Sequence, residues 1–260
     1  MTERAELPTD PEGWARRLKS NWERRAQHAS RDFFVASNPG WSDPETWERY
    51  ARQDLELFLT DFDRERLKKT DVLEIGCGSG RLAEFLGPIV GSYSGFDIAP
   101  SMVDGARERC KELDDCRFEV GGGLGVPEAL RDRRYGLILC VAVFIHCPKS
   151  VIESNLMDAW TLRTADADMR FQVLADPTSD TGLESPPQPE VSEQVAETLE
   201  TEVKQVLDER TEEEIALSTE EHYLGHPFLY DEVREMAEQQ TQGDVALYRG
   251  DLGSIFGRVR

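Results

Sequence analysis

The sequence lacks several features that would place a protein outside the cell or in a membrane. No stretch approaches the 18 consecutive apolar residues of a membrane-spanning helix. Residues 1–17 contain no apolar core of the kind found in signal peptides. The five cysteines are scattered and form no C-x-x-C pair, which argues against a disulfide framework and a structural zinc site. We therefore expect a cytoplasmic protein.

Basic residues are scarce relative to acidic ones. The 260 residues include 30 Lys and Arg against 51 Asp and Glu, a formal net charge of −21. Binding to a nucleic-acid backbone needs a basic face, so this balance argues against a nucleic-acid partner. Much of the excess is local, because residues 176–222 hold fifteen acidic and two basic side chains. The rest of the chain has the composition of a globular protein.

Helices are predicted before residue 68. Asp10 and Pro11 form a helix start, and Trp14, Leu18 and Trp22 then repeat at helical spacing, which predicts one apolar face. A second start signal at 42–45 is followed by a further apolar stripe that reaches Phe62.

In the middle of the chain, strand candidates alternate with helix candidates. The strand candidates are 72–75, 92–97, 116–120, 135–143 and 169–174, and the helical stretches are 79–87, 101–113, 127–132 and 149–163. This alternation predicts βαβ units and a parallel sheet that is buried on both faces. A helix candidate at 229–240 precedes two more strand candidates, 245–248 and 255–259, which are joined by a glycine-containing turn and predict an antiparallel hairpin.

The segment Glu74-Ile75-Gly76-Cys77-Gly78-Ser79-Gly80-Arg81 is the most informative one for function. A glycine turn between a buried strand and a helix lets the main chain approach a ligand closely. Asp97 follows at the end of the next strand candidate, where a carboxylate can accept hydrogen bonds from both hydroxyls of a ribose. A dinucleotide fingerprint would require glycine at position 81, which is arginine, so a nicotinamide dehydrogenase is disfavoured.

In these motifs the sequence resembles the class I S-adenosylmethionine-dependent methyltransferases. Residues 72–82, 95–102 and 135–146 are similar to the first, second and fourth motifs of that family. The resemblance covers about 70–174 and, loosely, the last 30 residues. It implies an α/β fold with a seven-stranded, mostly parallel, doubly wound sheet, a C-terminal antiparallel hairpin and a mainly helical lid. It also implies S-adenosylmethionine as the cofactor and S-adenosylhomocysteine as its product.

The resemblance implies a set of cofactor-binding residues, which are Glu74, Gly76, Cys77, Gly78, Gly80, Asp97, Ile98, Gly122 and Val141. In such enzymes the glycines border the methionine and ribose parts of the cofactor, and the acidic residue at position 97 holds the ribose. Cys77 is expected to fill space rather than to act as a nucleophile, because no adjacent basic residue lowers its pKa.

The chain departs from the family after the third strand candidate. Such enzymes often carry an acidic residue there that meets the adenine amino group, whereas this chain has glycine at 121–123. Either backbone carbonyls take the place of the acid, or the cofactor binds weakly or not at all.

His146 is the candidate catalytic base. It follows the fourth strand candidate, at the end where open α/β sheets bind ligands, and its unperturbed pKa lies near neutrality. The alternative is that it shapes the pocket or caps the helix that begins near Pro148. His222, Tyr223 and His226 are expected to contact the substrate. The two histidines could bind a metal only within a helix, which the glycine and proline around His226 disfavour, so no metal site is expected.

The resemblance also suggests how the chain is divided. Residues 1–68 are expected to form a helical lid, 69–175 the S-adenosylmethionine-binding core, 176–228 an acidic helical insertion, and 229–260 the last helix and strands. The predicted function is methyl transfer to the oxygen or nitrogen of a small-molecule acceptor by in-line displacement, with no nucleic-acid or membrane partner. Two alternatives stay open: a non-methylating enzyme that uses the same cofactor, by aminopropyl transfer or cyclisation, and a non-catalytic interaction module.

Overall fold

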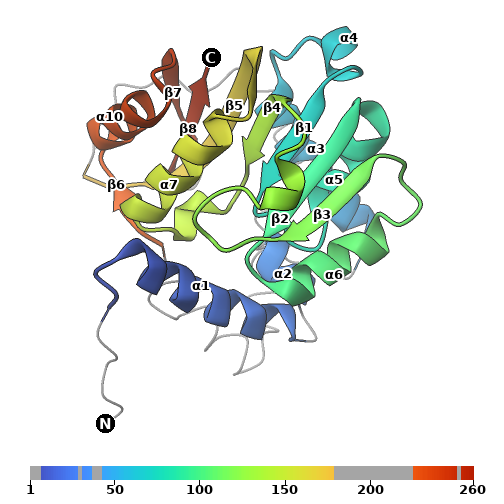
Figure 1. The fold of residues 1–260 in the computed structure, drawn as a ribbon, viewed down its shortest axis with the longest axis horizontal. Coiled ribbons are helices and arrows are strands. Elements are labelled where there is room, and N and C mark those ends of the chain that lie inside the picture. Colours follow the sequence, from blue (N-terminus) through green and yellow to red (C-terminus); the bar gives the residue numbers. More distant parts are fainter. Residues whose placement is uncertain (1–6, 29–30, 37–42, 179–224, 251–252) are drawn as a thin grey trace, which may run out of the picture.

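A mixed β-sheet runs through the centre of the computed structural model (Figure 1). The structure describes residues 7–28, 31–36, 43–178, 225–250 and 253–260. Seven strands follow the order β3-β2-β1-β4-β5-β8-β7. They are β1 (Asp71–Ile75), β2 (Ser92–Asp97), β3 (Cys116–Val120), β4 (Tyr135–Cys140), β5 (Arg163–Ala175), β7 (Val245–Arg249) and β8 (Ser254–Val259).

The pairing of the strands confirms the predicted fold class. β1 pairs in parallel with β2 and β4, and the parallel pairing continues outward to β3 and β5. β8 then lies antiparallel between β5 and β7. The sheet is therefore mostly parallel and ends in an antiparallel hairpin, as the alternation of strand and helix patterns predicts.

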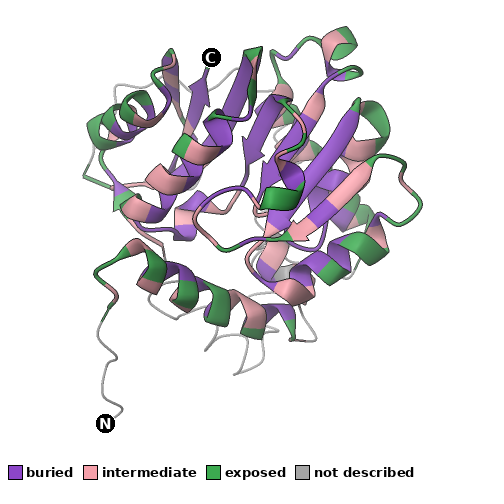
Figure 2. Ribbon diagram, in the orientation of Figure 1, coloured by how far each residue is buried: buried purple, intermediate pink, exposed green. Residues whose placement is uncertain are grey.

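Helices cover both faces of this sheet. They are α1 (Pro11–Ala26), α2 (Arg31–Ala36), α3 (Pro44–Leu59), α4 (Arg64–Leu67), α5 (Arg81–Leu86), α6 (Pro100–Arg109), α7 (Lys149–Trp160) and α10 (Tyr230–Thr241). One apolar cluster packs side chains of α1, α7 and α10 against the sheet, and another packs those of α3, α5 and α6. The strands between the two clusters are almost wholly buried (Figure 2), which explains their apolar runs.

The main differences from the sequence-based expectation concern two strands and one helix. β4 ends at Cys140 instead of 143, because Ala142 adopts a left-handed backbone with φ of 56° and a 3-10 turn, η3 (Phe144–His146), follows. The helix expected at 127–132 is only the 3-10 turn η2 (Glu128–Leu130). β5 begins at Arg163 rather than at Met169. A third 3-10 turn, η1 (Gly87–Ile89), continues α5.

Two of the helices before β1, α1 and α3, pack against different parts of the molecule. α1 begins with Pro11, and Asp10 caps it by accepting a hydrogen bond from the Gly13 amide at 2.7 Å. α1 crosses the carboxyl-end edge of the sheet and contacts both α6 and α7 (Figure 1). α3 packs instead on α5, where the indole of Trp47 donates to Glu84 at 3.0 Å.

A buried ion-pair cluster joins β5, β8 and the chain after α3. Asp168 is 1% exposed, and its Oδ2 lies 3.0 Å from Arg170 Nη2 and 2.6 Å from Arg258 Nη2. Asp61 contacts the same two guanidinium groups, at 2.9 Å from Arg170 Nη1. Because Arg170 and Arg258 are register partners, the cluster fixes the antiparallel strand against its parallel neighbour.

The two-residue strand β6 (Pro227–Phe228) pairs in parallel with the end of β5. The amide of Asp176 also donates to the carbonyl of Phe228 at 2.8 Å. The point where the chain leaves β5 and the point where it returns at β6 therefore lie side by side in the sheet. Most of the predicted acidic insertion, at 179–224, lies outside the described residues.

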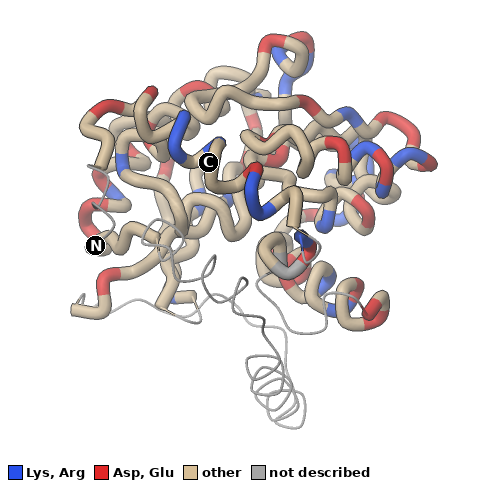
Figure 3. Tube along the Cα trace, turned by 90° about the horizontal axis from the view of Figure 1, so that it is seen from below, with Lys and Arg blue, Asp and Glu red and all other residues tan. Residues whose placement is uncertain are grey.

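Charged residues of both signs are interspersed along the described chain, as the view from the α1 side shows (Figure 3). Among the described residues, no helix is both long and apolar enough to cross a lipid bilayer.

Candidate functional site

A cavity of about 900 Å³, counted with the solvent at its mouth, opens at the carboxyl ends of the central strands. Its walls come from the ends of β1, β2 and β4, from α1 and α2, and from α7. The order of the strands reverses at β1, which has β2 on one side and β4 on the other. Ligands of open α/β sheets bind at such a switch point, because neighbouring connections leave the sheet toward opposite faces there.

The loop between β1 and α5 needs its glycines. Gly76, Gly78 and Gly80 have φ angles of 75°, 51° and 86°, in the region that side chains disfavour. A Cβ atom on Gly76 would lie 2.3 Å from Val143 Cγ2. The amides of Gly76 and Cys77 both donate to the carbonyl of Phe96, at 2.8 and 3.0 Å, which holds the loop against β2.

Asp97 fixes the other side of this loop. Its Oδ2 accepts a hydrogen bond from the Gly78 amide at 3.0 Å, and its Oδ1 accepts one from the Ala99 amide at 2.9 Å. Burial raises the pKa of Asp97 to about 6, although these amides act in the opposite direction. Each carboxylate oxygen has a second lone pair and can accept a further hydrogen bond from a ligand hydroxyl.

Glu74 is a second carboxylate in the cavity wall. It lies on β1, is 3% exposed, and accepts a hydrogen bond from the hydroxyl of Tyr93. Burial raises its pKa to about 7, while the Tyr93 hydroxyl and the Arg81 guanidinium lower it. A cationic ligand would stabilise the ionised form of both Glu74 and Asp97.

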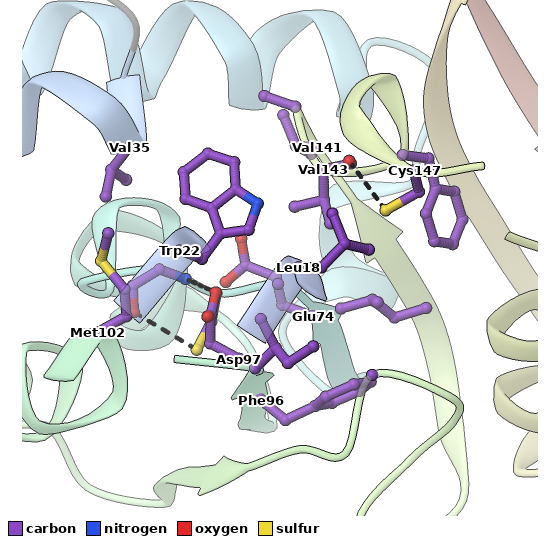
Figure 4. A pocket seen from close by; sticks show the side chains of 18 of the residues that line it. Leu18, Trp22, Val35, Glu74, Phe96, Asp97, Met102, Val141, Val143 and Cys147 are labelled. Atoms are coloured by element: carbon purple, nitrogen blue, oxygen red, sulfur yellow. Dashed lines mark hydrogen bonds between the residues drawn. The ribbon is translucent and has the colours of Figure 1, made fainter. Parts of the chain in front are cut away.

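The wall opposite the carboxylates is apolar and comes from the first two helices. Leu18 and Trp22 of α1 line the same cavity as Glu74 and Asp97 (Figure 4). Phe34 and Val35 of α2 complete this wall.

Polar contacts hold these helices in place. Glu23 of α1 accepts from the Ser101 amide at 3.1 Å and from the Ser101 hydroxyl at 2.5 Å, at the start of α6. Asp32 of α2 accepts from the Ser79 hydroxyl at 2.7 Å and from Arg109 at 2.8 Å. The helices that cover the cavity are thus tied to the glycine loop and to α6.

Seven of the nine residues predicted to bind a cofactor line this cavity; they are Glu74, Gly76, Cys77, Gly78, Asp97, Ile98 and Val141. Gly80 serves instead as the left-handed cap of α5, and a Cβ there would lie 3.1 Å from the Ala106 backbone. Gly122 is exposed, and its neighbour Gly123 lines the cavity.

Main chain forms the wall where the acidic residue of the family is missing. Asn155 of α7 donates to the Gly123 carbonyl at 2.9 Å and accepts from the Gly125 amide at 3.2 Å. Asp158, one turn later, accepts from the Val126 amide at 2.7 Å. The glycine-rich loop after β3 is therefore held from α7.

His146 lies behind the cavity wall. It ends η3, is 6% exposed, and its imidazole packs edge to face with the Trp22 indole, with the ring centroids 5.2 Å apart. It is absent from the cavity lining in the described part of the chain. His226 packs in the same way on Trp14, also at 5.2 Å, while His222 and Tyr223 lie outside the described residues.

Sequence reasoning expected a helical lid at 1–68, but it named none of the residues with which α1, α2 and α7 line the cavity. Trp22, Phe34, Arg81 and Asn155 line the cavity, although none was predicted to bind a ligand. The available signal was the apolar stripe of α1, since Trp14, Leu18 and Trp22 show that one face of this helix is covered. Helical periodicity does not show whether the covering partner is a protein core or a ligand.

Comparisons with known proteins show what this chain is similar to. Residues 72–162 match a family model described as a methyltransferase domain. The non-reducing polyketide synthase pkdA of Emericella nidulans is 28% identical over 116 residues, which are 42% of this chain. This chain spans only 5% of the length of that curated relative.

Solved methyltransferase structures share the fold over nearly the whole chain. Magnesium protoporphyrin IX methyltransferase from Synechocystis PCC 6803, with bound S-adenosylmethionine, covers 98% of this chain and 100% of its own, with a TM-score of 0.55 and 14% identity. N-methyltransferase NodS from Bradyrhizobium japonicum WM9, in complex with S-adenosylhomocysteine, covers 96% and 98%, with a TM-score of 0.54 and 15% identity.

Residues 72–162 of this chain therefore match a methyltransferase domain, and the chain shares the fold of these S-adenosylmethionine-dependent methyltransferases. This confirms the fold class that the resemblance implies.

Proposed function

We propose that this protein transfers the methyl group of S-adenosylmethionine to an oxygen or nitrogen atom of a small-molecule acceptor. The observation that carries the proposal is the cavity in which the glycine loop, Glu74 and Asp97 meet under α1. The matched methyltransferase domain spans all of these residues except those of α1.

The residues of the cavity fit this cofactor. Asp97 has acceptor capacity left for the ribose hydroxyls, and the buried Glu74 offers a carboxylate to the ammonium group. Gly76 has no side chain, so its main chain is accessible to a ligand, and even a methyl group at this position would collide with Val143. Ile98 and the loop held by Asn155 form the wall for the adenine.

When bound, S-adenosylmethionine supplies a methyl group on a sulfonium, which is already a strong electrophile. The chain then has to exclude water and align the acceptor. Leu18, Trp22 and Phe144 provide apolar walls for this purpose. The indole of Trp22 also offers an aromatic face to a cationic ligand, which is an attractive contact.

His146 is the proposed base for an acceptor that must lose a proton. Its contact with Trp22 places it one aromatic ring away from the cavity, so it would serve an acceptor that reaches past this indole. Conversion of His146 to glutamine should lower turnover more than cofactor affinity. Unchanged turnover over a range of pH would assign the imidazole to packing against Trp22.

The product of the cofactor tests the reaction itself. The purified chain is incubated with S-adenosylmethionine and mixtures of phenols, amines and carboxylic acids, and the nucleoside products are separated by mass spectrometry. Acceptor-dependent formation of S-adenosylhomocysteine is expected. Formation of 5′-methylthioadenosine would point to aminopropyl transfer or cyclisation, and absence of cofactor binding would favour a non-catalytic module.

A further inference from the structure

A second cavity lies between the end of α3 and the hairpin of β7 and β8, and we call it the hairpin groove. Its volume is about 460 Å³, counted with the solvent at its mouth. It is lined by the last turn of α3 and the two residues after it, by Arg170 of β5, and by residues of β7 and β8. It shares no lining residue with the cavity at the glycine loop, so the proposed methyl transfer does not use it.

The hairpin groove contains buried positive charge. Arg170 and Arg258 line it and are only 6% and 8% exposed, and both contact the carboxylates of Asp168 and Asp61. The more exposed Arg260 reaches the same two carboxylates at 3.4 and 3.6 Å. Burial alone would raise the pKa of Asp61, but the guanidinium groups of Arg170 and Arg258 hold it below its ordinary value, so this carboxylate is ionised at neutral pH. Three guanidinium groups therefore share two carboxylates, which leaves one positive charge uncompensated.

Arg258 also has hydrogen-bond donors left over. Its Nε and Nη2 donate to Asp168 at 3.0 and 2.6 Å, and its Nη1 donates to Asp61. Each terminal nitrogen of a guanidinium carries a second N–H, and the side chain of Arg258 makes no other hydrogen bond within the described part of the chain. Because Asp61 lines the groove as well, the Nη1 end of this guanidinium lies at the groove, where a carboxylate can accept from it.

The walls beside these charges are aromatic. Phe58 of α3 meets Phe256 of β8 edge to face, with the ring centroids 5.1 Å apart. Tyr248 of β7 is the register partner of Phe256, and both rings are only partly buried. Aromatic rings prefer edge-to-face and offset packing against other rings. A ligand that carries a flat ring therefore suits these walls better than an inorganic anion, which would leave the rings in water.

We propose that the hairpin groove binds an aromatic carboxylate, with the carboxylate at Arg258 and the ring against Tyr248 and Phe256. The single negative charge of such a ligand matches the one positive charge that the ion-pair cluster leaves uncompensated. The whole chain has a formal net charge of −21, so this attraction for an anion belongs to the cluster and not to the protein surface in general. The groove is a second ligand site, separate from the acceptor of the proposed reaction.

NMR titrations that observe the ligand test the proposal on the full chain. The probes are benzoate, its neutral analogue benzamide and the cationic benzylamine, each with and without S-adenosylhomocysteine. Benzoate should bind about 10- to 100-fold more tightly than benzamide, the range for a hydrogen bond to a charged group, and benzylamine should bind most weakly. Neither S-adenosylhomocysteine nor inorganic phosphate should displace benzoate.

A matched pair of substitutions assigns the binding to the groove. Thr60 is exposed and lines the groove next to Asp61. Thr60→Glu adds a negative charge there and should weaken benzoate binding by at least about tenfold. Thr60→Gln has the shape of the glutamate without its charge and should stay within about twofold of the wild type, as is usual for a surface substitution.

Arg258→Lys tests the guanidinium itself. It keeps the positive charge but loses the planar fork, so it should bind benzoate about tenfold more weakly than the wild type. Because Arg258 belongs to the buried ion-pair cluster, circular dichroism checks that this variant folds. If it does not fold, the Thr60 pair decides.

Several results would overturn the proposal. They are a wild-type chain that binds benzoate no more tightly than benzamide, equal benzoate affinities for Thr60→Glu and Thr60→Gln, and displacement of benzoate by S-adenosylhomocysteine. Displacement by inorganic phosphate would show a general anion site and would also overturn it. The assay for methyl transfer decides the proposed function separately, since that reaction uses the other cavity.

Discussion

Asp97→Asn should weaken cofactor binding much more than it weakens the fold. The carboxylate accepts hydrogen bonds from the amides of Gly78 and Ala99, one on each oxygen. An asparagine can accept from only one of them, so one buried N–H loses its partner at a cost of about 1–3 kcal/mol. Removing the charge offsets this cost, because a pKa raised from 3.8 to about 6 corresponds to a net penalty of about 3 kcal/mol on the ionised carboxylate.

In cofactor binding, no gain from removing the charge of Asp97 offsets the lost hydrogen bond. A hydrogen bond to a charged group contributes about 1.5–3 kcal/mol, so the loss of one ribose contact should weaken S-adenosylhomocysteine binding about 10- to 100-fold. The midpoint of thermal unfolding should change little. Asp43→Asn is a matched control, since Asp43 caps α3 by accepting from the Thr46 amide at 2.9 Å and does not line the cavity.

The raised pKa of Asp97 predicts how the affinity for the cofactor depends on pH. Below pH 6 the ligand-free protein holds a proton on Asp97, and a ligand that needs the carboxylate must expel it. Affinity should therefore fall as the pH drops from 7 to 5, by up to about tenfold per pH unit for this group, with a further contribution from Glu74 below pH 7. Asp97→Asn should remove the component near pH 6. Equal affinities for the variant and the wild type, measured by calorimetry at pH 7.5, would refute the ribose assignment.

Other substitutions test the loop, the sheet and the proposed base. Gly76→Ala should abolish cofactor binding, because the new Cβ would lie 2.3 Å from Val143 at a φ of 75°; retained affinity in calorimetry would contradict this. Asp168→Asn should lower the free energy of unfolding by about 3–5 kcal/mol in urea titrations, since it breaks a buried ion-pair cluster with Arg170 and Arg258. A loss below 1 kcal/mol would show that the cluster is replaceable. His146→Gln should lower turnover at least tenfold and flatten its dependence on pH, while S-adenosylhomocysteine affinity stays within about twofold. Turnover equal to that of the wild type would exclude the base.

The features that sequence reasoning predicted correctly are local ones. The strand, glycine turn and helix around Gly76 are contiguous, and Asp97 follows one βα unit later. Parallel strands bring their carboxyl ends to one edge of the sheet, so this short stretch is enough to place the cavity. The hairpin of β7 and β8 was predicted from its own turn in the same way.

The features that could not be predicted from the sequence depend on tertiary packing. Trp22 and Asn155 reach the cavity from helices that lie far from the glycine loop in sequence, and no short motif connects them. His146 was expected at the end of a strand that continues to residue 143. The left-handed backbone at Ala142 ends that strand early and turns the chain, which leaves the imidazole against Trp22.

The pairing of β6 with β5 has a consequence for how this fold can change. Leu174 lies beside Pro227 and Ala175 beside Phe228, so the sheet itself holds the two points where the chain departs and returns. The entropy of closing such an excursion grows only with the logarithm of its length, by about 0.6 kcal/mol per doubling. Insertions of very different length and composition can therefore be exchanged at this junction with little effect on the sheet. The same sheet could therefore carry different inserted segments at this junction without a change in its own strand pairing.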